Sequence, residues 1–209
     1  HLIAGMKDVP GNVREVSDGL IYRDFITVGL LLNKLKITEK GKKLVEDTWL
    51  YIQEPDVKIG RLQIFNNWSP YMVKEKDKVW IGLEYFCFKN DDLWNKTEKE
   101  MAQFAIDELT KIGIIDKVDV LDSFVFKMEK TYPAYFGHYA RFEEIRSFID
   151  KFENLFLVGR NGMHKYNNQD HSMLTAMQAV ENIKSRIKTK DNIWKINTEQ
   201  EYHEDKAKK

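Results

Sequence analysis

The 209-residue chain is long enough to form one large domain, or one domain together with part of a second. Its 33 lysine and arginine residues balance 33 aspartate and glutamate residues, so no net charge attracts it to nucleic acid or to an anionic membrane. A hydrophobic content of 43% predicts a folded core, and the apolar runs are too short to span a bilayer.

The first half of the chain is predicted to form a small antiparallel sheet. Residues 1–7 are predicted to end a strand, and residues 10–19 to form a polar connection. Runs rich in β-branched and aromatic residues then predict four strands, over residues 22–35, 48–53, 59–68 and 78–88. Alternation in the third run places Ile59, Arg61, Gln63 and Phe65 on one face of the sheet.

The second half is predicted to alternate helices with strands. A helical repeat covers residues 97–112, with Thr97 as its N-cap, Glu100 completing a capping box and Gly113 ending it. The pattern then predicts a strand over 118–128, a helix over 140–152, a short apolar strand over 155–158 and a helix over 170–188. The tail from Thr198 is polar and is predicted to fray.

The stretch from Asn154 to Val180 carries the strongest functional signal. An apolar run leads into Gly159, a polar loop follows, and Asn168 or Asp170 can cap the next helix. Such a loop would present free amides near residues 169–172, and amides at a helix start suit an anionic or polar ligand. An ordinary surface loop with an N-cap explains the pattern equally well, so the pattern alone leaves both interpretations open.

This stretch resembles the C-terminal flavin-binding motif of UDP-galactopyranose mutases and, more broadly, of the protoporphyrinogen oxidase and amine oxidase group. The resemblance rests on Gly159-Arg160, on His164-Lys165-Tyr166, on Asn168-Gln169-Asp170 and on Ala176 and Ala179. It implies that FAD contacts the residues around the helix start, namely Gly159, Arg160, Asn168, Gln169, Asp170 and His171. The mutases have tyrosine in place of His164 and methionine in place of Gln169, and these departures leave the substrate open.

Weaker matches lie upstream, in the order that the mutases show. Asp56-Val57 with Gly60-Arg61 resembles the segment whose arginine holds the substrate diphosphate, a role that suits the two parallel donors of a guanidinium. Tyr132-Pro133 resembles a segment whose tyrosine approaches the sugar diphosphate. The resemblance therefore implies substrate contacts at Arg61, Tyr132, His164 and Tyr166. Without it, Arg61 fits a solvent-facing strand residue and Tyr132 fits a packing residue.

The elements and the resemblance together predict an α+β fold. A largely antiparallel, twisted sheet with two to three helices would occupy residues 1–152. Residues 153–190 would form the last strand and helix of an FAD-binding Rossmann-type domain. Residues 191–209 would form a polar tail. No G-x-G-x-x-G motif follows a strand, so an N-terminal portion of the same protein would bind the flavin pyrophosphate. The chain alone is therefore expected to bind flavin poorly and to be inactive.

The activity implied is that of a mutase that converts UDP-galactopyranose to UDP-galactofuranose for cell-surface polysaccharide, including lipopolysaccharide. Reduced FAD would carry the covalent chemistry, so no catalytic side chain is assigned. Two alternatives stay open: an FAD-dependent oxidoreductase of the amine oxidase or protoporphyrinogen oxidase type, and a non-catalytic binding module. The expected partners are a nucleotide sugar, the N-terminal FAD-binding portion and a second copy in a homodimer.

No metal site is predicted, because His138, His164 and His171 lack the spacing of metal-binding motifs. Cys87 lies in an apolar run and is predicted to be a buried, unreactive thiol. As the single cysteine, it excludes an internal disulfide and indicates a reducing, cytoplasmic location.

Overall fold

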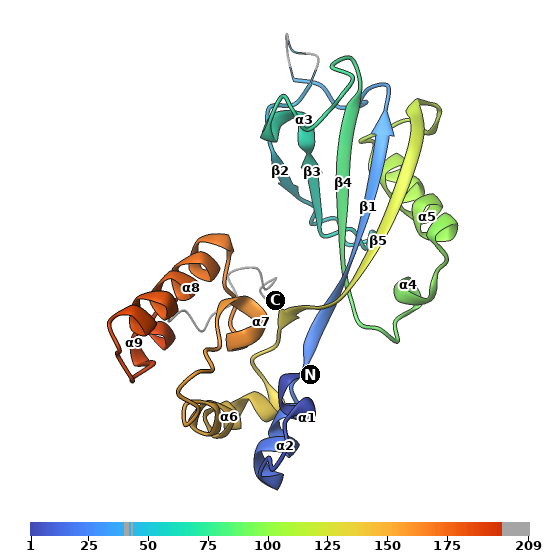
Figure 1. Cartoon of the computed structure of the whole chain (residues 1–209). Coiled ribbons are helices and arrows are strands. Elements are labelled where there is room, and N and C mark those ends of the chain that lie inside the picture. The colour runs from blue at the N-terminus through green and yellow to red at the C-terminus, as the bar shows by residue number, and fades with distance from the viewer. Residues whose placement is uncertain (40–41, 43, 198–209) are drawn as a thin grey trace. The chain divides into compact units, whose positions relative to one another are not determined.

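The structure is a computed structural model that describes residues 1–39, 42 and 44–197 (Figure 1). The chain divides into two compact units, each described by itself below. His1–Arg23 and Lys130–Lys209 form the helical unit, and Asp24–Glu129 forms the sheet unit. The predicted boundaries at residues 152 and 190 concern the domains of a whole enzyme and stay a prediction.

Five antiparallel strands form one sheet in the order β2-β3-β4-β1-β5 (Figure 1). Their bounds are β1 Tyr22–Leu32, β2 Trp49–Tyr51, β3 Arg61–Ile64, β4 Val79–Cys87 and β5 Val120–Pro133. The register pairs Asp24 with Cys87 between β1 and β4, and Arg61 with Glu84 between β3 and β4. The strands predicted over 22–35, 48–53, 78–88 and 118–128 are therefore confirmed.

Helix α5 (Glu98–Lys111) covers one face of this sheet. Its fully buried Met101, Ala105 and Leu109 pack against alternate strand residues that include Ile26 and Leu83. Burying these apolar surfaces supplies the main stabilisation of the sheet unit. The opposite face carries no helix of comparable length among the described residues of this unit.

The predicted capping box of α5 is confirmed in full. The Glu100 N–H donates to Thr97 Oγ1 at 3.3 Å, and the Thr97 N–H donates to the Glu100 carboxylate at 2.8 Å. Gly113 follows the helix with a φ of +76°, the left-handed conformation in which glycine ends helices without strain.

The strand predicted over residues 59–68 is too long, because β3 ends at Ile64 and the chain turns into α3 (Phe65–Trp68). The side chain of Asn66 replaces the lost strand pairing with β4. Its amide nitrogen donates to the Lys78 carbonyl at 2.8 Å, and its oxygen accepts from the Trp80 N–H at 3.0 Å. The sheet unit also contains α4 (Asp92–Asn95) and a 3-10 turn, η1 (Lys117–Asp119).

The helical unit consists of short helices around two apolar clusters. Its helices are α1 Leu2–Gly5, α2 Gly11–Asp18, α6 Phe142–Ile149, α7 Gly159–Met163, α8 Gln169–Lys184 and α9 Asp191–Trp194, with the 3-10 turn η2 at Gly137–Arg141. One cluster joins α1, α2 and α6 through Ile3, Val13, Val16, Ile145 and Ile149. The other joins α7, α8 and α9 through Met163, Ala179, Ile193 and Trp194. The helices predicted over 140–152 and 170–188 are confirmed.

Two N-terminal predictions are wrong. Residues 1–7 contain α1 instead of a strand end, since one helical turn is enough to bury Ile3. Residues 10–19 contain α2 instead of a polar connection. Pro10 stands just before the first helical residue, where its fixed backbone favours a helix start. Val13 and Val16 lie one turn apart and are both buried.

Two C-terminal predictions are also wrong. Residues 155–158 are apolar as expected but form no strand, because no described strand pairs with them in a ladder. Residues 191–197 of the predicted polar tail contain α9, which buries Ile193 and Trp194. The remainder, residues 198–209, lies outside the described residues.

The predicted α+β class is confirmed, although the described residues form nine α-helices, where two to three were predicted with the sheet and one more in the FAD-binding part. Four of the nine have eight or more residues. None of the described helices combines the length and the apolar character needed to cross a bilayer.

Candidate functional site

The predicted flavin loop lies in the helical unit, between α7 and α8. Gly159 opens α7 with a φ of +72°, a conformation that strains every residue with a side chain. Its N–H donates to Thr175 Oγ1 at 3.0 Å, and the fully buried Thr175 hydroxyl donates to the Ser172 carbonyl at 2.9 Å. These bonds fix the start of the loop against the first turns of α8.

Arg160 contacts three oxygen atoms and two aromatic rings. Its Nε donates to the Asn167 carbonyl at 2.9 Å, while its two terminal nitrogens approach the Thr131 carbonyl at 3.5 Å and Asn168 Oδ1 at 3.4 Å. Its guanidinium carbon lies 4.9 Å from the ring centre of Tyr132 and 4.7 Å from that of Tyr166. In the part of the chain that the structure describes, no carboxylate forms an ion pair with Arg160, so its positive charge is not neutralised locally.

The rings of Tyr132 and Tyr166 stack on each other, with centres 5.6 Å apart and planes 19° from parallel. Tyr132 is the second-last residue of β5 and is 7% exposed, whereas Tyr166 is half-buried in the loop. Arg160, Tyr132 and Tyr166, here called the Arg160 cluster, are three of the predicted site residues, and the fold brings them together. The guanidinium contacts both rings, so each member holds the other two in place.

The Arg160 cluster has a supporting residue that the sequence did not reveal. The Tyr166 N–H donates to the hydroxyl of Tyr135, which lies two residues beyond the end of β5. Burial raises the pKa of Tyr135 above its usual value, so this hydroxyl stays protonated at neutral pH. Its closeness to Pro133 was the one signal in the sequence that could have pointed to it.

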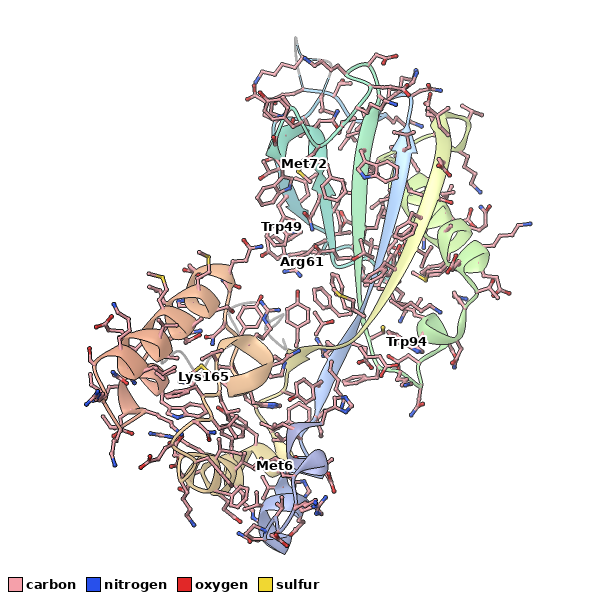
Figure 2. All side chains as sticks on the ribbon, viewed as in Figure 1. Met6, Trp49, Arg61, Met72, Trp94 and Lys165 are labelled. Atoms are coloured by element: carbon pink, nitrogen blue, oxygen red, sulfur yellow. The ribbon has the colours of Figure 1, made fainter. Side chains whose placement is uncertain are left out.

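The loop is also anchored by the segment that was predicted to be a polar tail. Lys165 Nζ donates to the Trp194 carbonyl at 2.7 Å and to the Asn197 carbonyl at 3.1 Å (Figure 2 labels Lys165). The Asn197 side chain donates to the Tyr166 carbonyl at 2.8 Å. Burial lowers the pKa of Lys165, and the nearby charge of Arg146 lowers it further. The apolar pair Ile193-Trp194 was the sequence signal for this packing.

His164 is a packed residue of the helical unit. It has a left-handed φ of +48°, is 1% exposed and contacts the rings of Tyr22, Tyr139 and Phe142. Its Nε2 lies 3.1 Å from the Ala134 carbonyl, so Nε2 carries the proton and donates it. Burial lowers the pKa of His164, which keeps the ring neutral at physiological pH. A substrate contact at His164 stays a prediction.

The start of α8 presents free backbone donors. Asn168 precedes the helix in extended conformation, and its side chain does not cap it. The first backbone N–H of the helix that donates to the Asn168 carbonyl is that of Ser172, at 3.0 Å. Among the described residues, the N–H groups of Gln169, Asp170 and His171 therefore have no acceptor, as at any uncapped helix start. Asn168, Gln169 and Asp170 are exposed, so the predicted cofactor contacts lie where a ligand can reach them.

Arg61, the remaining predicted substrate contact, lies in the sheet unit (Figure 2). Its Nε donates to the Glu84 carboxylate, which also accepts from the Gln63 amide. The Arg61 guanidinium carbon lies 4.8 Å from the ring centres of both Trp49 and Phe86. At 3% exposed, Arg61 is not the solvent-facing strand residue that its sequence neighbours suggested. Its contact with a diphosphate stays a prediction.

No group of three His, Cys, Asp or Glu side chains that could hold a metal ion occurs among the described residues. The predicted burial of Cys87 is confirmed, since it is 2% exposed within the core of the sheet unit.

The fold is similar to that of two solved structures, one of a mutase and one of a protein assigned as an oxidase. A reduced UDP-galactopyranose mutase matches with a TM-score of 0.72 and 18% identity, over 88% of this chain and 38% of the mutase chain. A protein of Exiguobacterium sp. 255-15, assigned as a protoporphyrinogen oxidase, matches with a TM-score of 0.51 and 15% identity, over 71% of this chain and 33% of that one. The likeness to the mutases and oxidases that the sequence predicted is thus confirmed at the level of the fold.

At these identities the two matches show the fold alone. The chain spans less than two fifths of the length of the mutase that it matches. No protein-family model matches the sequence, and no curated protein matches it.

Proposed function

We propose that the chain is part of an FAD-dependent enzyme and that the Arg160 cluster belongs to its active site. The observation that carries the proposal is the position of Arg160, whose charge has no carboxylate partner among the described residues, beside the uncapped start of α8. Both features favour an anionic or acceptor-rich ligand. The fold likeness to a mutase and an oxidase supports the same proposal.

The residues at the start of α8 fit a flavin. A flavin ring system presents carbonyl oxygens, and the N–H groups of Gln169, Asp170 and His171 are donors without acceptors among the described residues. Asn168 adds an exposed amide, and Gly159 keeps the backbone free of a side chain where the loop begins. When bound, FAD would supply the redox or nucleophilic chemistry, to which we assign no side chain of this chain.

The substrate we propose is a nucleotide sugar, and the reaction is the isomerisation of UDP-galactopyranose to UDP-galactofuranose with reduced FAD. Arg160 would bind a phosphate oxygen, because its guanidinium is already oriented by carbonyl and ring contacts. Tyr132 and Tyr166, stacked on each other beside that charge, would line the sugar-phosphate site. A role in cell-surface polysaccharide synthesis, in the cytoplasm, belongs to the same proposal.

An oxidoreductase of the protoporphyrinogen oxidase or amine oxidase type is the second candidate. The fold likeness to the Exiguobacterium protein supports it, as does the packing of His164 where the mutase motif has tyrosine. Such an enzyme needs the substrate carbon over the flavin and no diphosphate site. Arg160 would then orient the cofactor instead of the substrate.

The partner we propose is the rest of an FAD-binding domain in the same protein. Helix α8 exposes a stripe of large apolar side chains that the described residues of the helical unit leave uncovered: Met173, Leu174, Met177, Val180 and Ile183. Single exposed apolar residues are ordinary, but five on one helix are typical of an interface. The apolar residues 155–158 lie in no described sheet, so a neighbouring strand of that domain would give them a partner.

The test uses the natural gene product that contains this chain, purified and reduced with dithionite. It is incubated with UDP-galactofuranose, and UDP-galactopyranose is measured by chromatography. The proposal predicts conversion that depends on reduction and falls by about 100-fold in Arg160→Ala, on the scale of losing a charged contact to a phosphate. Arg14→Ala, which removes an arginine of α2, is the matched control. Flavin-loaded protein without conversion would favour the oxidoreductase, and protein without flavin would leave a binding module.

A further inference from the structure

The sheet unit carries a group of exposed aromatic rings at its β2 edge. Trp49 and Tyr51 stand two residues apart on β2, so both point to the same face, and Trp68 ends the short helix α3. Their exposed fractions are 37%, 56% and 47%, which are large values for aromatic residues. Figure 2 labels Trp49 and Arg61, whose guanidinium carbon lies 4.8 Å from the Trp49 ring centre. Trp49, Tyr51 and Trp68 are called the aromatic platform below.

The rings of the platform form an ordered surface. The planes of Trp49 and Tyr51 are 13° from parallel, with their centres 6.3 Å apart. Trp68 meets Trp49 edge-on, with centres 6.0 Å apart and planes 61° from parallel. Exposed aromatic rings held in fixed contact offer faces on which a ring-shaped ligand can stack.

Polar contacts fix the residues beside the platform. The Arg61 guanidinium packs against the Trp49 ring at 4.8 Å and is itself fixed by Glu84. The side-chain amide of Asn67, next to Trp68, donates to the Val45 carbonyl at 2.7 Å and to the Asp47 carbonyl at 2.8 Å. These bonds tie α3 to the segment that leads into β2. A surface whose side chains are already ordered loses little entropy when a ligand binds.

The charges around the platform select for a neutral ligand. The Arg61 guanidinium lies 4.8 Å from the Trp49 ring centre and is paired with the buried carboxylate of Glu84. The platform itself offers ring faces together with polar tips, namely the indole N–H groups of Trp49 and Trp68 and the Tyr51 hydroxyl. A sugar ring matches both features, since it has an apolar C–H face and a rim of hydroxyl groups. An isolated phosphate matches neither.

We propose that the aromatic platform binds a neutral carbohydrate by stacking a sugar ring on Trp49 and Tyr51. The site is composed of residues other than the Arg160 cluster and needs no flavin. It would hold a saccharide acceptor or product chain, and it would do so in the polypeptide described here. A failure of the flavin proposal therefore leaves this one standing, and the reverse also holds.

The experiment is saturation-transfer NMR on the 209-residue chain with a galacto-oligosaccharide as the probe. We expect transfer to the ring C–H protons of the sugar, and an affinity that weakens about tenfold in Trp49→Ala and in Tyr51→Ala, as the loss of one stacked ring implies. Tyr51→Phe keeps the ring and should bind within about twofold of the wild type. Phe124→Ala is the matched control, because Phe124 is 59% exposed on β5, at the opposite edge of the same sheet.

Circular dichroism and the dispersion of the NMR spectrum establish that each variant is folded. If Trp49→Ala loses its fold, Tyr51→Ala and Tyr51→Phe carry the test. Absent transfer to the saccharide overturns the proposal, and so does equal transfer in Tyr51→Ala and the wild type. Transfer to uridine but not to the saccharide would make the platform a nucleobase site. Self-association that Tyr51→Ala abolishes would make it an interface between copies, and either result rejects a carbohydrate site.

Discussion

Removal of the buried carboxylate of Glu84 is predicted to destabilise the sheet unit strongly. In Glu84→Leu, Arg61, at 3% exposure, would lose the carboxylate that accepts from its Nε. Loss of one partner of a buried ion pair costs about 3–5 kcal/mol. The Gln63 amide also loses its acceptor, which adds about 1 kcal/mol. The rings of Trp49 and Phe86 stay beside the guanidinium and offset about 1–2 kcal/mol, so we expect a net loss of about 3 kcal/mol.

Urea unfolding of the purified chain, followed by circular dichroism and tryptophan fluorescence, measures this loss. The double variant Arg61→Met with Glu84→Leu buries no charge and should recover at least half of the lost stability. Glu129→Leu breaks the exposed pair with Lys89 in the same unit and should leave the unfolding midpoint unchanged. An exposed ion pair contributes up to about 1 kcal/mol to the free energy of unfolding. If Glu84→Leu lowers that free energy by less than about 1 kcal/mol, the pair behaves as an exposed one and the reasoning is refuted.

Three further predictions concern other buried or capping groups. The pKa of His164 is lower in the folded chain than its ordinary value of 6.5, so below that pH the unfolded chain binds more protons than the folded chain. The stability of the folded chain should therefore fall as the pH drops below about 6.5. His164→Phe should flatten this pH dependence of stability in thermal melts. Lys190 is 5% exposed, and its ammonium group donates to the carbonyls of Phe152 and Leu155 at 2.6 and 2.8 Å. Lys190→Met should therefore lower the free energy of unfolding in urea by about 2 kcal/mol. An unchanged unfolding midpoint would contradict this prediction. Thr97→Ala removes the capping box of α5 and should cost about 1 kcal/mol, whereas Thr97→Ser should cost much less.

The parts of the fold that the sequence predicted are those with local causes. Thr97, Glu100 and Gly113 fix the ends of α5 through bonds within a few residues, and each behaves as expected. The strands that pair in the central sheet were also predicted, because β-branched and aromatic runs mark them. Helix α2 was missed because its apolar signal comprises only Val13 and Val16 among polar residues, and those two become meaningful only when α6 packs on them.

The candidate site divides in the same way. The motif named Arg160, Tyr132 and Tyr166, but only the folded chain shows that they form one cluster, because β5 delivers Tyr132 from 28 residues upstream of Arg160. The sequence could not show that Glu84 neutralises Arg61, since that contact depends on the register between β3 and β4. Tyr135 and Asn197 were missed for the same reason, since both act through contacts more than thirty residues away in the chain.

The flavin content of the natural gene product that contains this chain tests the central claim most directly. Visible flavin absorption per protein is compared in the wild type, in Gln169→Ala and in Gln169→Pro. Proline is tolerated at the first position of a helix, which Gln169 occupies, but it removes the backbone N–H that we assign to the flavin. We predict that the wild type and Gln169→Ala retain FAD and that folded Gln169→Pro loses most of it. A wild type without flavin, or equal flavin in all three proteins, would contradict the account.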